Sequence, residues 1–298
     1  MSFGTGARFM GMCGISAAVA DSSDVIFSNP AGLGEIDSFM LSSSSGKVLD
    51  DTNYLSLNGT YPLGKLSSIG IGYAGGFISG IDIRNSAGTF LNKANYGNSV
   101  FAFGFGKKFA DSFSVGASIK YYSVDSAEIA SSTGRGLNVD VGLLKRGWDW
   151  ISFGLVGKNI LTSSQINYSN SENTPLPQEL SLGTNINILG GKMHSIIISP
   201  VELNVLAQAN FGLNQTKPVG LLTGIEFSPS PYLTLRTGSG ADKFSAGISL
   251  NFAGIGIHYA YTTRSEFSET SGTYISISYD EKGWPLEEQT PSYFSQKS

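Results

Sequence analysis

The chain of 298 residues lacks any run of about 18 apolar residues, which excludes an ordinary transmembrane helix. Charge is also scarce, because Asp, Glu, Lys and Arg make up only 14% of the residues, whereas soluble domains usually carry about 25%. The net charge of -4 comes without a cluster of Lys and Arg, which excludes a nucleic-acid partner. The single cysteine, Cys13, excludes an internal disulfide framework.

The sequence also has few residues that could support catalysis or bind a metal. Its two histidines are His194, beside a predicted turn, and His258, on a predicted strand, so a clustered imidazole site is not expected. Neither H-E-x-x-H, G-x-S-x-G nor a spaced cysteine pair is present. A hydrolase that uses His258 with a nearby serine and Asp140 is the alternative. We predict that the chain is not an enzyme and holds no metal or cofactor.

Short segments of alternating polarity fill the chain from residue 38 onward. In "LNVDVGL", Val139 and Val141 face one side of an extended chain while Asp140 faces the other. The 38 glycines, 13 tyrosines and 18 phenylalanines are typical of a β-rich chain with tight turns. The alternation predicts fourteen strands, over 38–46, 52–62, 66–79, 96–107, 112–124, 136–145, 149–158, 178–188, 195–211, 217–227, 231–237, 242–252, 254–262 and 273–279.

The lengths of these strands and of their connections predict a membrane barrel. Several strands have ten or more residues, close to the ~9–11 residues that a tilted strand needs to cross a bilayer. Connections after even-numbered strands are short, and several after odd-numbered strands are long, as in outer-membrane barrels. A soluble β-sandwich is the alternative. A fourteen-stranded barrel, however, is too wide for its own side chains to fill, so its apolar faces should point outward into lipid. The predicted fold class is all-β, a transmembrane antiparallel β-barrel.

The opposite face of each strand would then line the lumen with polar residues. Most of them are expected to keep the interior polar and wet and to pair with one another. A subset is predicted to hold a ligand or an inserted segment. The candidates are Lys120, Asp140, Glu202, Glu226, Arg236 and His258.

The opening stretch "GARFMGMCGISAAVADSSDVIFSNPAGL" differs from the rest of the chain and has two interpretations. As a signal peptide it would have Arg8 near its start and "AVA" at 18–20 as a cleavage site. Gly11 and Gly14 interrupt the apolar run, however, and the residues before Arg8 are not basic. We therefore expect a mature segment, with any signal peptide removed upstream of Met1.

This stretch resembles the amino-terminal signature of the PorV/PorQ family of outer-membrane proteins, relatives of the FadL-type transporters of hydrophobic compounds. Cys13 departs from the signature where glycine is usual, and Ser22 stands where a second acidic residue is common. The matching positions are Gly6, Ala7, Arg8, Gly11, Met12, Gly14, Ala20, Asp21, Asn29, Pro30, Ala31, Gly32 and Leu33.

The resemblance implies a barrel in the bacterial outer membrane whose lumen holds the N-terminal residues as a plug. Arg8, Asp21 and Asp24 are expected to pair with lumen charges. Asn29 and Pro30 are expected to start a turn, because proline biases the preceding residue away from the helical region. The chain then divides into a plug over 1–37, a transmembrane barrel over 38–279 and a periplasmic C-terminal tail over 280–298.

The resemblance also suggests two functions. The first is a FadL-like conduit for small hydrophobic molecules such as fatty acids, opened by movement of the plug. FadL-like proteins have a lateral opening at a kinked third strand, and Gly75 and Gly76 stand at the matching place in "YAGGF", where paired glycines weaken the ladder. The alternative for this pair is packing under a neighbouring aromatic residue.

The second function is that of a non-conducting accessory or scaffold subunit of an outer-membrane protein secretion system. Its contact surfaces would be the loops over 80–95 and 159–177, which are rich in Ser, Asn, Gly and Thr. Outer-membrane lipid is an expected partner for both functions. Hydrophobic small molecules are the further partner of a conduit, and a secretion-machinery subunit is the further partner of a scaffold.

Overall fold

The structure, a computed structural model, describes residues 5–48, 52–109, 113–126, 132–146, 150–190, 195–214, 219–264 and 271–283. His194 and residues 284–298 of the predicted tail lie outside these ranges. The strands are β1 (Met40–Val48), β2 (Thr52–Gly64), β3 (Ser67–Arg84), β4 (Phe90–Phe109), β5 (Phe113–Ser126), β6 (Ser132–Arg146), β7 (Ile151–Lys158), β8 (Gln165–Tyr168), β9 (Asn173–Pro175), β10 (Glu179–Gly190), β11 (Ile197–Ile198), β12 (Glu202–Gly212), β13 (Gly220–Ser230), β14 (Leu233–Gly240), β15 (Lys243–Phe252), β16 (Ile255–Arg264) and β17 (Ser271–Asp280).

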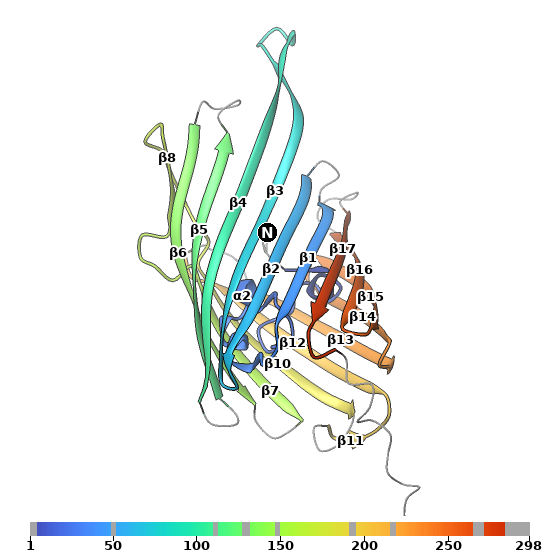
Figure 1. Ribbon diagram of the computed structural model, residues 1–298. Helices are drawn as coiled ribbons and strands as arrows, with labels where there is room; N and C mark the ends of the chain where they lie inside the picture. The colour runs from blue at the N-terminus through green and yellow to red at the C-terminus, as the bar shows by residue number, and fades with distance from the viewer. Residues whose placement is uncertain are drawn as a thin grey trace, which may run out of the picture.

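Fourteen of these strands close into one antiparallel barrel (Figure 1). The first strand, β1, pairs with the last, β17, from Met40 opposite Asp280 to Val48 opposite Gly272, and pairs with β2 on its other side. The short strands β8, β9 and β11 do not interrupt the ring, because β10 pairs directly with β7 and β12. The ladder therefore continues around the cylinder and satisfies backbone groups that lipid cannot bond. The predicted fourteen-stranded barrel is confirmed.

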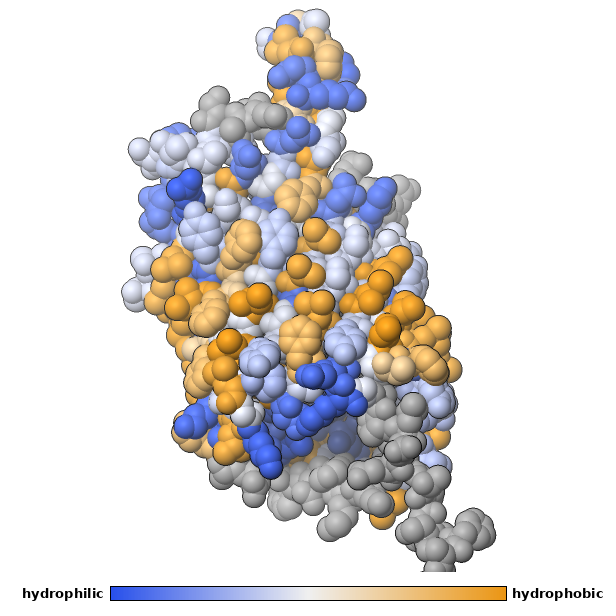
Figure 2. All heavy atoms as spheres, viewed as in Figure 1, coloured by the Kyte–Doolittle hydropathy of each residue, from blue (hydrophilic) through white to orange (hydrophobic). Residues whose placement is uncertain are grey.

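Side chains alternate between the outside and the inside of the wall, as the sequence predicts. On β4, Phe103 is 53% exposed whereas Ala102 is 6% exposed. On β16, Ile257 is 52% exposed whereas His258 is 6% exposed. Figure 2 shows hydrophobic residues gathered in a band across the middle of the visible face, with hydrophilic residues towards both ends. An apolar band around a closed barrel is suited to contact lipid.

Strands β3 and β4 extend well beyond their neighbours as a two-stranded ribbon (Figure 1). The prediction of a loop over 80–95 is wrong, because β3 continues to Arg84 and β4 begins at Phe90. The strand does not end at Gly80, which lies in a register shift and takes a φ of 74°. Glycine adopts that conformation at no steric cost, so the ribbon bends there without ending.

The N-terminal segment, defined here as residues 5–36, lies inside the barrel (Figure 1). It contains the α-helices α1 (Ala7–Met10) and α2 (Val25–Ser28) and the 3-10 helix η1 (Pro30–Glu35). None of the described helices is long and apolar enough to cross a membrane. Within residues 5–36, Asp21 is the only exposed residue.

The barrel interior is more apolar than the sequence predicts. Inward-facing Leu206 and Leu222 form one buried cluster with Phe9 and Met12 of the N-terminal segment. A second buried cluster joins aromatic and aliphatic wall residues to α1 and α2. The prediction of a wet, polar lumen is therefore wrong where the segment lies, because inward apolar side chains pack against it instead of meeting water.

Candidate functional site

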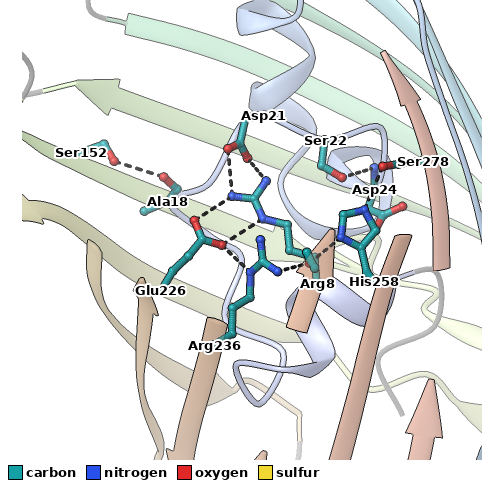
Figure 3. Close-up of polar contacts among 11 residues, drawn as sticks. Arg8, Ala18, Asp21, Ser22, Asp24, Ser152, Glu226, Arg236, His258 and Ser278 are labelled. Carbon is teal, nitrogen blue, oxygen red and sulfur yellow. Dashed lines mark hydrogen bonds and ion pairs between the residues drawn. The ribbon is translucent and has the colours of Figure 1, made fainter. Parts of the chain in front are cut away.

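Four charged side chains form a network where the N-terminal segment meets β13 and β14 (Figure 3). The guanidinium of Arg8 lies 2.6 Å from the carboxylate of Asp21 and 3.2 Å from that of Glu226 on β13. Glu226 also accepts a hydrogen bond of 2.5 Å from Nε of Arg236 on β14. The structure thus brings together four predicted site residues, two from the segment and two from the wall.

His258 on β16 extends this network towards β17 (Figure 3). Its Nδ1 lies 2.6 Å from the hydroxyl of Ser249, and its Nε2 lies 2.8 Å from that of Ser278. Arg236 donates to the same Ser249 hydroxyl. Asp140 is not part of this network, because it pairs with Lys120. Among the described residues, no group of His, Cys, Asp and Glu is placed to hold a metal ion.

The charges of the network balance within the protein. Burial alone would lower the pKa of Arg8, but the ion pairs with Asp21 and Glu226 outweigh burial and raise that pKa above its usual value. Arg8 therefore stays charged inside the barrel. Glu202, the first residue of β12, is exposed, and in the described part of the chain no hydrogen bond or ion pair joins it to the network. The arrangement fixes the segment to the wall rather than presenting an unpaired charge to a ligand.

A separate network lies on β5 and β6, where Lys120 forms an ion pair with Asp140. Asp140 also accepts the backbone N–H of Asn159 at 2.9 Å, and the hydroxyl of Tyr122 donates to the Asn159 side chain at 2.8 Å. The ammonium of Lys120 lies 5.6 Å from the ring centre of Phe27 in α2, a cation–π distance. Lys120 and Asp140, both predicted as ligand candidates, therefore contact each other, Asn159 and the N-terminal segment.

Asn29 and Pro30 form the start of η1, as expected from the turn signal. The Asn29 side-chain oxygen accepts the backbone N–H of Ala31 at 3.0 Å. Its amide nitrogen donates to the carbonyl of Ala17 at 2.6 Å and to that of Leu143 on β6 at 3.2 Å. One amide thereby caps the helix, joins two parts of the segment and bonds the wall.

Asp24, which the sequence predicts to pair with a lumen charge, is buried and accepts hydrogen bonds from neutral groups instead. It accepts hydrogen bonds from the backbone of Gly6 at 2.9 Å, from Ser42 on β1 at 2.7 Å and from Asn58 on β2 at 2.6 Å. Burial raises the pKa of Asp24, and these three hydrogen bonds oppose the rise. The sequence signal for two of these donors is the inward position of Ser42 and Asn58 on adjacent strands, which together form a polar patch on the inner wall.

Glu35 and Gln208 form further polar contacts between the segment and the wall, and they lie outside the predicted set of site residues. Glu35 lies 2.9 Å from the ammonium of Lys108 and accepts a hydrogen bond of 2.5 Å from Ser114. The side-chain oxygen of Gln208 on β12 accepts the backbone N–H of Ser16 at 2.9 Å. Alternation predicts that Gln208 points inward. It does not predict the partner of Gln208, because that partner belongs to a segment without a repeating pattern.

Gly75 and Gly76, the lateral-gate candidates, lie in an unbroken part of the wall. Both pair in continuous register with β2 and β4, and the register shift falls farther along β3 at Gly80. A side chain at Gly75 would meet the ring of Phe77 at 2.8 Å, so an aromatic residue covers this glycine. A cavity of about 330 Å³ opens beside it, lined in part by Phe77 and Asp125. An opening at this place stays a prediction.

Comparison with known sequences finds no matching protein family and no matching curated protein. Solved structures do match the fold. The monoaromatic hydrocarbon channel CymD matches with a TM-score of 0.62 at 14% identity, over 93% of this chain and 97% of that chain. The toluene transporter TbuX of Ralstonia pickettii matches with a TM-score of 0.61 at 15% identity, over 93% and 98% of the two chains. A FadL homologue of Pseudomonas aeruginosa matches with a TM-score of 0.60 at 11% identity, over 93% and 98%.

The closed wall, its apolar outer band and its internal segment define the class as a transmembrane β-barrel with an occupied interior. Within that class the chain has the fold of the FadL-type channels named above.

Proposed function

We propose that this protein is a bacterial outer-membrane conduit for small hydrophobic molecules such as fatty acids or small aromatic hydrocarbons. The observation that carries the proposal is the shared fold, which extends over 93% of this chain and relates it to proteins described as hydrocarbon channels. The apolar outer band supports placement in a membrane. The even number of antiparallel strands is the form that bacterial outer-membrane barrels take.

We propose further that the N-terminal segment acts as the plug of this conduit. Its buried position against the inner wall leaves no wide aqueous pore through the part of the lumen that it occupies. Such a barrel suits hydrophobic cargo, because hydrophobic molecules bind an apolar surface more favourably than they enter a water-filled pore. Water-soluble solutes would be excluded by the same packing.

The test is uptake in bacterial cells that lack their own FadL-type protein. Cells that express the chain should accumulate a labelled fatty acid or labelled toluene faster than cells with an empty vector, and should not gain permeability to a labelled sugar. A second control is an unrelated barrel expressed at the same level. Equal uptake of the hydrophobic compounds in all three strains would refute the conduit.

The second candidate function is the PorV/PorQ-like scaffold of a secretion system. The observation in its favour is the ribbon of β3 and β4, whose tip carries the exposed apolar residues Phe90 and Leu91. A scaffold should retain a stable partner after extraction in mild detergent, and replacing both tip residues with serine should release that partner. Recovery of the barrel alone, together with measurable uptake, would leave the conduit as the function.

A further inference from the structure

The backbone of the N-terminal segment lies directly against the inner wall at positions where the wall has no side chains. A Cβ atom on Gly154 of β7 would overlap the carbonyl oxygen of Ala17, and one on Gly238 of β14 would lie 2.5 Å from the carbonyl carbon of Met12. Such separations are far below contact distance, so only glycine fits. Nine of the fourteen strands supply inward glycines that face the segment, which are Gly70, Gly72, Gly104, Gly106, Gly116, Gly142, Gly154, Gly183, Gly224, Gly238 and Gly247.

Polar groups of the wall also bond the backbone of the segment. Ser276 on β17 accepts the N–H of Ala7 at 2.6 Å, and Ser245 on β15 accepts the N–H of Cys13 at 2.7 Å. A displaced segment would leave these buried acceptors without their donors, at a cost for each one. The ion pairs of Arg8 and the apolar clusters would be lost in the same movement. The segment therefore fits the barrel as a permanent core.

A second segment, which follows β7 where that strand ends at Lys158, is much less buried than the N-terminal segment. This cap, defined as residues 159–177, follows the inner face of β6, where a Cβ atom on Gly136 would lie 2.8 Å from the carbonyl oxygen of Gln165. Its strand β8 forms only two ladder pairs with β6, at Gly134 and Arg135. Its residues 169–175 are all exposed.

The cap contacts the wall through a small apolar cluster and through hydrogen bonds, which include those of Asn159 to Asp140 and Tyr122 and those of Ser169 to Thr133. Ile166 and Leu176 pack with Val124 on β5 and with partly buried tyrosines of β4, β5 and β8. Asn138 on β6 donates to the hydroxyl of Ser164 at 2.7 Å. Separating such a cluster exposes far less apolar surface than withdrawing a segment of which most residues are buried.

We infer that the cap is the moving gate of the barrel and that the N-terminal segment stays in place while cargo passes. The role of the cap in transport rests on the proposed conduit. The difference in mobility between the cap and the N-terminal segment rests on their packing alone. Opening then consists of lifting Ile166 and Leu176 from the inner faces of β4 and β5, which uncovers an apolar, tyrosine-lined surface inside the wall. Hydrophobic cargo can replace those two side chains on the same surface.

Hydrogen exchange tests the difference in mobility between the two segments and does not depend on transport. In the full chain in detergent micelles, backbone amides of residues 5–36 should exchange as slowly as those of the barrel strands, while amides of residues 159–177 should exchange much faster. Equal exchange in the two segments, or faster exchange in the N-terminal segment, would overturn the inference whether or not the barrel transports anything.

Two disulfide locks, each tested by uptake in cells, show which segment must move for transport. Ser245→Cys places a thiol beside the native Cys13, whose sulfur lies 3.2 Å from the Ser245 hydroxyl, and fixes the N-terminal segment to β15. Arg135→Cys with Asn167→Cys, a facing pair of β6 and β8, fixes the cap in a chain that also carries Cys13→Ser. Uptake should equal that of the parent chain with the first lock, and should be lost with the second until a reductant is added.

The matched control is Ser123→Cys with Arg135→Cys, which links β5 to the same residue of β6 across a ladder that stays closed. This lock should leave uptake unchanged. Loss of uptake with the lock at Cys13, or normal uptake with a fully oxidised cap lock, would overturn the inference. Absence of uptake in the parent chain would refute the conduit, and the exchange experiment would then decide the mobility of the two segments separately.

Discussion

The guanidinium group of Arg8 lies 3.2 Å from the carboxylate of Glu226, although 218 positions separate the two residues in the chain. The contact joins the first helix of the N-terminal segment to β13. Glu226 is also bound by Arg236, so one wall carboxylate holds a segment residue and a neighbouring strand together. This pair is one of the contacts that fix the segment to the wall.

Removing the positive charge of this pair should destabilise the barrel. We expect Arg8→Ala to lower the free energy of unfolding by about 2 kcal/mol, below the usual cost of breaking a buried ion pair because Arg236 still neutralises Glu226. The measurement is chemical unfolding of the purified barrel in micelles. Arg84→Ala is the matched control, since Arg84 pairs with Asp82 on the exposed ribbon. Its effect should stay below about 1 kcal/mol, and equal effects of the two substitutions would contradict the structure.

Adding a single methyl group to the inner wall should disturb the same packing. A Cβ atom on Gly142 of β6 would overlap the side-chain oxygen of Asn29, which also caps η1. We expect Gly142→Ala to cost at least about 2 kcal/mol by overpacking. A suitable control is Gly59→Ala on β2, where the nearest atom lies at an ordinary 3.6 Å. Thermal unfolding followed by circular dichroism compares the two, and unchanged stability of Gly142→Ala would mean that the segment lies elsewhere.

Asp24 should make the stability of the barrel depend on pH. Burial raises its pKa in the folded state, so the folded barrel holds a proton at this carboxyl more tightly than the unfolded chain does. That contribution is fully present below the unfolded pKa of about 4, and is lost as pH rises through the higher folded value. We expect the unfolding temperature of the parent chain to fall more steeply across this window than that of Asp24→Asn. Parallel profiles would show that Asp24 has no raised pKa.

The wall of the barrel could be predicted from sequence because alternation is a local property. Phe103 and Ala102, or Ile257 and His258, are assigned to opposite faces by their order alone, and the structure confirms both assignments. The far ends of β3 and β4 were missed because Gly80 looks like the end of a strand. Only the pairing of the two strands shows that this glycine sits in a bulge within a continuing ribbon.

The contents of the barrel could be predicted only in part. Inward charges such as Lys120 and Glu226 are visible in the strand pattern, but their partners are set by closure of the whole ring. The fit of the N-terminal segment against inward glycines is also invisible in sequence, because a glycine within a strand can mark a bulge, a bend or the close approach of another backbone. The inward apolar residues Leu206 and Leu222 pack against partners in the segment, which the strand pattern alone does not identify.

The arrangement of lipid outside and segment inside can be measured most directly by tryptophan quenching. Two variants in which the native tryptophans are replaced by phenylalanine would carry Phe103→Trp on the outer wall or Phe27→Trp in the buried segment. In bilayers of lipids with brominated acyl chains, fluorescence from position 103 should be strongly quenched and fluorescence from position 27 nearly unaffected. Equal quenching at both positions, or stronger quenching at position 27, would contradict the account.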